Sequence, residues 1–174
     1  MARRKRFIAV AGNIGAGKSE LVTFLCRRYG LQAFLEPHEA NPYLEDFYRD
    51  MKAFAFRSQL YFLAHKLRLH REVMATPRPV VLDRTIYEDA EIFARNLHDT
   101  GCIDARDWQT YCDLYRSIAC TLDPPDLMIF LDCPVRSLRK RIAGRGRAME
   151  SDIPVSYLRR LDKLYRAWRA RWDL

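Results

Sequence analysis

The apolar segment Phe7–Ala11 runs directly into the glycine-rich segment Gly12–Ser19, and this junction constrains the fold more than any other part of the chain. The second segment reads GNIGAGKS and matches G-x-x-x-x-G-K-[ST], a loop that follows a strand and opens a helix. Glycines let the backbone N–H groups turn inward around an anion, and the helix start adds partial positive charge. We therefore expect a triphosphate site, with Lys18 at the terminal phosphates and Ser19 on Mg²⁺; its residues are Gly12, Asn13, Ile14, Gly15, Ala16, Gly17, Lys18 and Ser19.

Apolar runs and amphipathic segments alternate along the rest of the chain. Strands are predicted at 7–11, 31–35, 79–83 and 127–131, and helices at 17–29, 43–74 with a break near Asp50, 87–98, 104–121, from Pro134, and from Pro154 to about 171. This alternation predicts a single α/β domain over residues 1–174, with a central parallel sheet covered by helices on both faces. Ligands of such sheets bind beyond the carboxyl ends of the strands. The residues at those ends are Gly12–Ser19, Glu36, Asp83, Arg84 and Asp132.

The net charge of +8 at first suggests a nucleic-acid partner. The charge is unevenly spread, however, because residues 7–135 contain 14 basic and 18 acidic residues, whereas residues 136–171 contain 12 basic and 3 acidic ones. Such clustering indicates a compact anion site and not a surface that coats nucleic acid, although a solvated helix face produces the same pattern.

Membrane insertion and secretion are not expected. No apolar run approaches the roughly 20 residues of a membrane span. The chain has five cysteines, an odd number without a C-x-x-C pair, which favours buried reduced thiols over zinc ligands and fits the cytoplasm.

The phosphate loop alone does not indicate a reaction. GTPases need an N-K-x-D motif, which this sequence lacks, and mechanical ATPases usually place an acidic pair after an apolar strand, where this chain has Asp83-Arg84 and Asp132-Cys133. Small-molecule kinases are therefore the favoured class. Two alternatives stay open: a nucleoside-monophosphate kinase of similar fold, and a nucleic-acid-binding P-loop ATPase that uses the basic C-terminal segment.

Five motifs in order resemble the deoxyribonucleoside kinase family, in particular the group that phosphorylates deoxyadenosine, deoxyguanosine or deoxycytidine. They are Glu36-Pro37, Asn41–Leu44, Phe56–Phe62, Asp83–Asp89, and the run from Arg141 to Pro154 that contains RxxxRGRxxE. The resemblance spans nearly the whole chain. It implies a three-layer P-loop nucleoside-kinase fold, transfer of the ATP γ-phosphate to a deoxynucleoside 5′-hydroxyl in nucleotide salvage, and a homodimer formed through the apolar helices near 43–74 and 87–121.

The resemblance also implies roles in catalysis. Glu36 resembles the general base that takes the proton of the 5′-hydroxyl, and Arg84 would keep Glu36 ionised and contact the 5′-oxygen. Asp83 resembles the acidic residue of the Mg²⁺ site, although capping of the next helix would equally explain it. Three arginines match a mobile lid at about 141–152 that would offset charge on the transferred phosphoryl group: Arg141, Arg145 and Arg147.

Recognition of the nucleoside is implied at five further positions. Tyr48 and Glu150 resemble the pair that binds the 3′-hydroxyl, and Gln59 and Asp89 resemble the residues that read the base edge. An acceptor such as Asp89 suits the exocyclic amino group of adenine or cytosine, which argues against thymidine. Lys66 lies seven residues after Gln59 on the same side of one helix, where the family usually has Arg.

The family pattern continues past the lid helix into a fifth strand, a loop that contacts the adenine of ATP, and a closing helix. The sequence stops at Leu174 without them. Either this tail lies outside the sequence, or the chain is a shortened variant in which adenine recognition is an open question.

Overall fold

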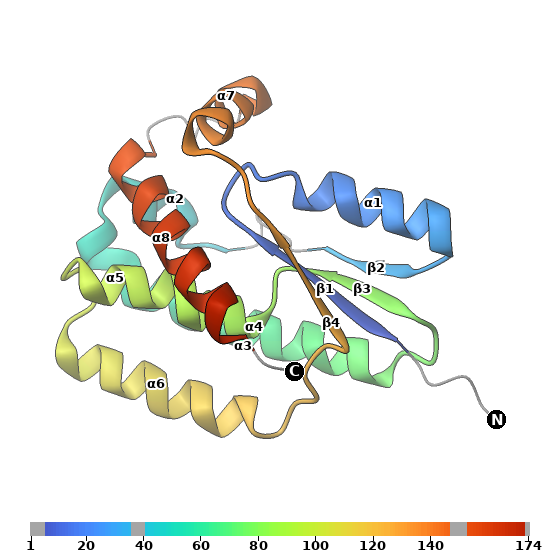
Figure 1. Cartoon of the computed structure of the whole chain (residues 1–174). Coiled ribbons are helices and arrows are strands. Elements are labelled where there is room, and N and C mark those ends of the chain that lie inside the picture. The colour runs from blue at the N-terminus through green and yellow to red at the C-terminus, as the bar shows by residue number, and fades with distance from the viewer. Residues whose placement is uncertain (1–5, 36–40, 147–152, 173–174) are drawn as a thin grey trace.

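A parallel sheet forms the centre of the computed structural model, which describes residues 6–35, 41–146 and 153–172 (Figure 1). Its four strands lie in the order β2-β3-β1-β4. They are β1 (Phe7–Gly12), β2 (Gln32–Phe34), β3 (Val80–Asp83) and β4 (Leu127–Leu131). Every pairing is parallel, so the predicted strands and the predicted parallel sheet are confirmed.

The helices also follow the predicted segments closely. They are α1 (Lys18–Tyr29), α2 (Leu44–Arg49), α3 (Met51–Ala75), α4 (Ile86–Glu88), the π-helical turn η2 (Asp89–Ala94), α5 (Arg95–Asp99), α6 (Ala105–Ala119), α7 (Val135–Arg145) and α8 (Val155–Arg171). The predicted break at Asp50 is confirmed, and the side chain of Asp50 caps α3 by accepting a hydrogen bond from the Ala53 N–H at 3.1 Å. The π-helical turn was not predicted, because apolar spacing alone does not distinguish one wide turn from an α-helical one.

Side chains of each strand alternate between two apolar layers, which gives the three-layer arrangement expected from the sequence. Ile8 and Val10 of β1 pack with Val22 and Leu25 of α1 on one face. The opposite faces of β1, β3 and β4 pack against α3, η2 and α8; this core includes Phe7, Ala9, Leu82, Met128, Leu158, Leu161 and Trp168. Figure 1 shows α1 on one side of the sheet and α3 and α8 on the other.

The shared direction of the strands brings their carboxyl ends to one edge of the sheet. Val10 of β1 lies opposite Asp83 of β3, and Gly12 lies opposite Leu131 of β4. The glycine-rich loop and the Asp83-Arg84 pair therefore emerge side by side, although 71 residues separate Gly12 from Asp83.

Over the described ranges, no helix is long and apolar enough to cross a lipid bilayer. All five cysteines carry free thiols: Cys26, Cys102, Cys112, Cys120 and Cys133.

Candidate active site

The glycine-rich loop between β1 and α1 is shaped by two left-handed glycines. Gly15 has a φ of 78° and Gly17 a φ of 96°, conformations that side chains disfavour. A Cβ atom at Gly15 would also lie 3.0 Å from Cγ1 of Ile142 and 3.2 Å from the Leu138 carbonyl oxygen of α7. The curl of the loop and its close contact with α7 therefore both require glycine at position 15.

Polar side chains hold the loop in place. Asn13 bridges it to α8, because its Oδ1 accepts from the Ile14 N–H at 2.8 Å and its Nδ2 donates to the Leu158 carbonyl at 3.0 Å. The buried Lys18 folds over the loop and donates from Nζ to the carbonyls of Gly12 (2.8 Å) and Asn13 (3.2 Å). The ammonium group thus lies at the concave side of a backbone that is suited to anions.

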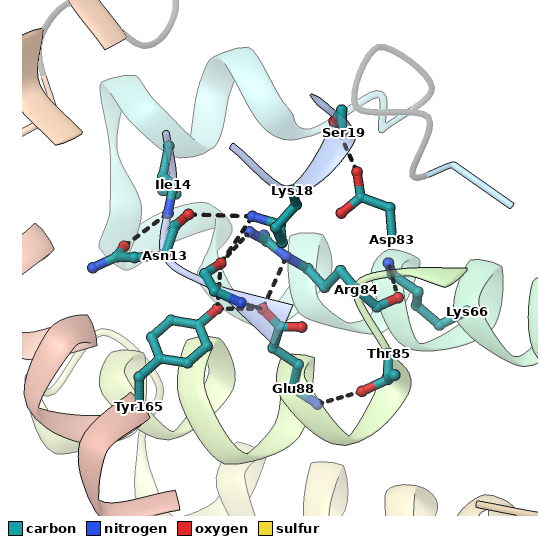
Figure 2. A network of polar contacts seen from close by, with 11 residues as sticks. Asn13, Ile14, Lys18, Ser19, Lys66, Asp83, Arg84, Thr85, Glu88 and Tyr165 are labelled. Carbon is teal, nitrogen blue, oxygen red and sulfur yellow. Dashed lines mark hydrogen bonds and ion pairs between the residues drawn. The ribbon is translucent and has the colours of Figure 1, made fainter. Parts of the chain in front are cut away.

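Ser19 and Asp83 meet where α1 begins and β3 ends (Figure 2). The Ser19 hydroxyl donates to Oδ2 of Asp83 at 2.8 Å. The other carboxylate oxygen, Oδ1 of Asp83, is buried and has no hydrogen-bond partner within the described ranges. A hydroxyl beside an unsatisfied carboxylate oxygen fits the ligands that Mg²⁺ prefers. The cap of the following helix is instead Thr85, whose Oγ1 accepts from the Glu88 N–H at 3.2 Å.

Arg84 has an unusual backbone and a buried side chain. Its φ of 66° makes it the one non-glycine residue with positive φ in the part of the chain that the structure describes. The Lys66 ammonium stabilises this conformation by donating to the Arg84 carbonyl at 2.9 Å. The guanidinium group lies 4.3 Å from the ring centroid of Phe93, and its Nε is 3.4 Å from Oε1 of Glu88.

Glu88 and Tyr165 complete this cluster, and sequence reasoning assigned no role to either. Oε1 of the fully buried Glu88 accepts from the Gly12 N–H at 3.2 Å and from the Tyr165 hydroxyl of α8. Burial raises the pKa of Glu88, whereas Arg84, Lys18 and the two hydrogen bonds act in the opposite direction. Burial and the nearby Glu88 raise the pKa of Tyr165 well above its ordinary value, so its hydroxyl keeps its proton. The helical spacing of Tyr165 with Leu158, Leu161 and Trp168 indicated only a core position.

A cavity that is open to solvent lies beside these residues. The structure brings the predicted phosphate end and the predicted nucleoside end to this one space. Its polar lining includes Lys18, Ser19, Tyr48, Gln59, Asp83, Arg84, Asp89 and Arg145. Its apolar walls, none of which was predicted as a site residue, include Leu44, Phe47, Phe62, Phe93 and Tyr157.

The remaining predicted site residues fall into three groups. Arg141 of α7 lies beside the loop and donates from Nη1 to the Ala16 carbonyl at 2.9 Å. Lys66 is 1% exposed and directs its ammonium group to the Arg84 backbone, below the cavity. Glu36, Arg147 and Glu150 lie outside the described residues.

Comparisons with known proteins agree on one family. The family described as deoxynucleoside kinase matches residues 8–174. The deoxyadenosine/deoxycytidine kinase of Bacillus subtilis is 36% identical over 167 residues, which cover 95% of this chain and 77% of that protein. The deoxyadenosine kinase of Dictyostelium discoideum is 38% identical over 158 residues, which cover 91% of this chain but 64% of that protein.

Solved structures give the same result. A structure of deoxyadenosine kinase from M. mycoides with bound dATP superposes with a TM-score of 0.86 at 31% identity, and the match covers 95% of this chain and 84% of that one. The three-layer α/β fold of this chain is therefore the fold of a nucleoside kinase.

Proposed function

Because the chain belongs to the deoxynucleoside kinase family, we propose that its cavity binds deoxyadenosine, deoxyguanosine or deoxycytidine together with ATP and transfers the γ-phosphoryl group to the 5′-hydroxyl. One observation carries this proposal: a phosphate-binding loop and a set of base-edge hydrogen-bonding side chains line the same cavity. The lining of this cavity includes Lys18 and Ser19 of the loop as well as Gln59 and Asp89.

At the phosphate end, the backbone of Gly12–Ser19 binds the triphosphate, and Lys18 offsets charge on its terminal phosphates. The residues that would hold Mg²⁺ are Ser19 and Asp83, since a buried Asp83 oxygen has no other partner among the described residues. When bound there, the ion neutralises charge on the phosphate oxygens.

At the reacting centre, Glu36 accepts the proton of the 5′-hydroxyl while the 5′-oxygen forms a bond to the γ-phosphorus and the bond to the ADP oxygen breaks. Arg84 keeps Glu36 ionised and contacts the 5′-oxygen. The buried position of Arg84, close to Glu88 and Phe93, supports this role, because a side chain held from two sides loses little freedom when substrate binds.

At the nucleoside end, Gln59 and Asp89 read the base edge, and Tyr48 and Glu150 bind the 3′-hydroxyl. Asp89 is 3% exposed and lines the cavity, and its carboxylate is an acceptor suited to the exocyclic amino group of adenine or cytosine. Lys66 supports this site from below through the Arg84 carbonyl.

The lid arginines approach the triphosphate from α7. Arg141 already lies against the loop backbone, and Arg145 lines the cavity. We propose that these two side chains and Arg147 stabilise the equatorial oxygens during transfer.

Two further proposals concern the setting of the enzyme. A homodimer is supported by exposed apolar side chains on α3 and α6, namely Met74 and Leu114. Light scattering should then give twice the chain mass of 20.5 kDa. Free thiols at all five cysteines support residence in the reducing cytoplasm.

The decisive experiment is a panel of acceptors with Mg·ATP, followed by ADP release. We expect turnover with deoxyadenosine, deoxyguanosine or deoxycytidine and at most weak turnover with thymidine. Turnover with the corresponding monophosphates instead of the nucleosides would indicate a nucleoside-monophosphate kinase. ATP hydrolysis stimulated by DNA would indicate the nucleic-acid-binding alternative.

A further inference from the structure

Glu88 is a buried carboxylate that does not itself line the cavity but pairs with Arg84, which does. Its exposed fraction is 0%, and its side chain lies beneath the start of the phosphate loop (Figure 2). Its Oε1 accepts hydrogen bonds from the Gly12 N–H at 3.2 Å and from the Tyr165 hydroxyl, and it forms an ion pair with the Arg84 guanidinium, whose Nε lies 3.4 Å away. A buried carboxylate is costly, and this convergence indicates that its interactions serve a purpose beyond packing.

Tyr165 extends the cluster to α8. Its hydroxyl contacts Oε1 of Glu88 and also lies 3.0 Å from the Gly12 carbonyl. Gly12 is thus contacted through both its N–H and its carbonyl by residues 76 and 153 positions away in the chain. Lys18 of the loop also donates to the Gly12 carbonyl, whereas the partner of the Gly12 N–H comes from outside the loop.

Glu88 also restricts the side chain of Arg84. The guanidinium group lies between the Phe93 ring at 4.3 Å and the Glu88 carboxylate, and a further nitrogen approaches the Gly12 carbonyl at 3.4 Å. Because Oε1 of Glu88 contacts both the Arg84 Nε and the Gly12 N–H, Glu88 links the Arg84 side chain to the start of the phosphate loop.

We propose that Glu88 and Tyr165 are positioning residues that hold the Arg84 guanidinium and the first residue of the phosphate loop in a fixed mutual geometry. This inference rests on the proposed phosphotransfer, in which Arg84 contacts the 5′-oxygen of the acceptor and Gly12 belongs to the loop that binds the triphosphate. Neither residue contacts substrate itself; both act through their neighbours.

The test compares Glu88→Gln with Glu91→Gln. Glu91 lies on the same helical segment but pairs with Arg171 at the surface, at 3.4 Å. We expect Glu88→Gln to lower kcat by about 10–100-fold and the nucleoside KM to change by less than about threefold, because the base-reading side chains are untouched. Glu91→Gln should stay within about twofold of wild type.

A second pair of variants each lacks one tyrosine hydroxyl group. Tyr165→Phe should lower kcat by about 3–10-fold, whereas Tyr115→Phe, on α6 and away from the loop, should leave it unchanged. Because Glu88 and Tyr165 act on the same contact, the double variant should lie within about twofold of Glu88→Gln. Additive losses, or a wild-type kcat for Glu88→Gln in protein with a normal unfolding transition, would overturn the proposal.

A binding measurement separates this inference from the proposed reaction. Mg·ATP titrated by calorimetry needs no acceptor, and Glu88→Gln should bind it at least about threefold more weakly than Glu91→Gln, because the Gly12 N–H loses a charged partner. If wild type phosphorylates no nucleoside but this difference in ATP affinity is present, the proposed reaction is wrong and the positioning role stands. Equal affinities in the two variants would overturn the positioning role.

Discussion

Two arginine–carboxylate pairs of identical spacing lie in very different regions of the molecule. Arg84, which lines the cavity, and Glu88, which is buried behind it, pair at 3.4 Å, with side chains 8% and 0% exposed. Arg95 and Asp99 pair at 3.0 Å on α5, with side chains 54% and 46% exposed. The surface pair is the shorter one, yet water screens it and its side chains are otherwise unrestrained. The two pairs share the same spacing and differ mainly in burial. Burial therefore distinguishes the pair next to the cavity from the pair on the helix surface.

The largest loss of turnover is expected for a substitution of Lys18 in the cavity region, compared with a substitution of a surface lysine. Lys18→Met removes the buried ammonium group next to the loop, and we expect kcat to fall by roughly 100–1,000-fold because charge on the terminal phosphates is no longer offset. Steady-state kinetics with Mg·ATP measure this. Lys52→Met on α3 is the surface control, and equal turnover of the two variants would contradict the contrast.

Asp83 should give the next largest effect. Asp83→Asn keeps the size of the side chain but removes the negative charge beside Ser19, so we expect kcat to fall by about 100-fold. The Mg²⁺ concentration for half-maximal activity should rise in the same titration, because a carboxylate oxygen is lost as a ligand. Asp99→Asn on α5 serves as the control. An unchanged Mg²⁺ dependence would exclude Asp83 as a metal ligand.

At Asp89 we expect a substitution to change the preference for one nucleoside over another more than the overall rate. Asp89→Asn replaces an acceptor with a group that also donates, so the preference for deoxyadenosine over thymidine in kcat/KM should fall by about tenfold, or about 1.4 kcal/mol. Competition between the two nucleosides measures the ratio directly. A preference equal to that of wild type would remove Asp89 from the base-reading set.

The Glu88 carboxyl group should also make the free energy of unfolding depend on pH. Burial raises the pKa of Glu88 in the folded chain above the ordinary value of 4.5. Between these two pKa values, the folded state therefore binds more protons than the unfolded state. The free energy of unfolding of wild type should therefore fall, relative to that of Glu88→Gln, as pH rises from the ordinary pKa through the raised one. Urea titrations of both proteins across this range measure the difference. A constant difference would show that the carboxyl group titrates alike in both states.

The smallest effect is expected at the surface pairs. Arg95→Ala and Arg116→Ala each remove an exposed ion pair, so the free energy of unfolding should change by less than about 0.5 kcal/mol. Turnover should stay within about twofold of wild type. A larger loss in either variant would mean that the helix surfaces contribute more than their exposure indicates.

Much of the fold follows from local patterns in the sequence. The glycine-rich loop, the four strands and the break at Asp50 depend on residues that are close together in the chain, and the structure confirms all three. The position of Lys18 and Asp83 at one cavity follows from the rule for parallel sheets, whereas Gln59 of α3 was assigned to the site through the family resemblance.

The contacts that organise the floor of the site were not predictable in this way. Glu88 looked like one more acid beside Asp89, and its partner Tyr165 lies 77 residues further along the chain. Lys66 was grouped with Gln59 by helical spacing, whereas its ammonium group reaches the backbone of Arg84 at the end of β3. The left-handed backbone of Arg84 gives no local signal at all, because glycine is the residue expected at such a φ.

The bond between Tyr165 and the Gly12 carbonyl has a consequence for the biosynthesis of the protein. During synthesis the phosphate loop leaves the ribosome before one of its anchors, which follows 153 residues later. At 5–20 residues per second, the loop waits for roughly 8–30 seconds before α8 can lock it. Because β4 ends at Leu131, 34 residues before Tyr165, newly made chains should complete their sheet roughly 2–7 seconds before α8 can hold the loop.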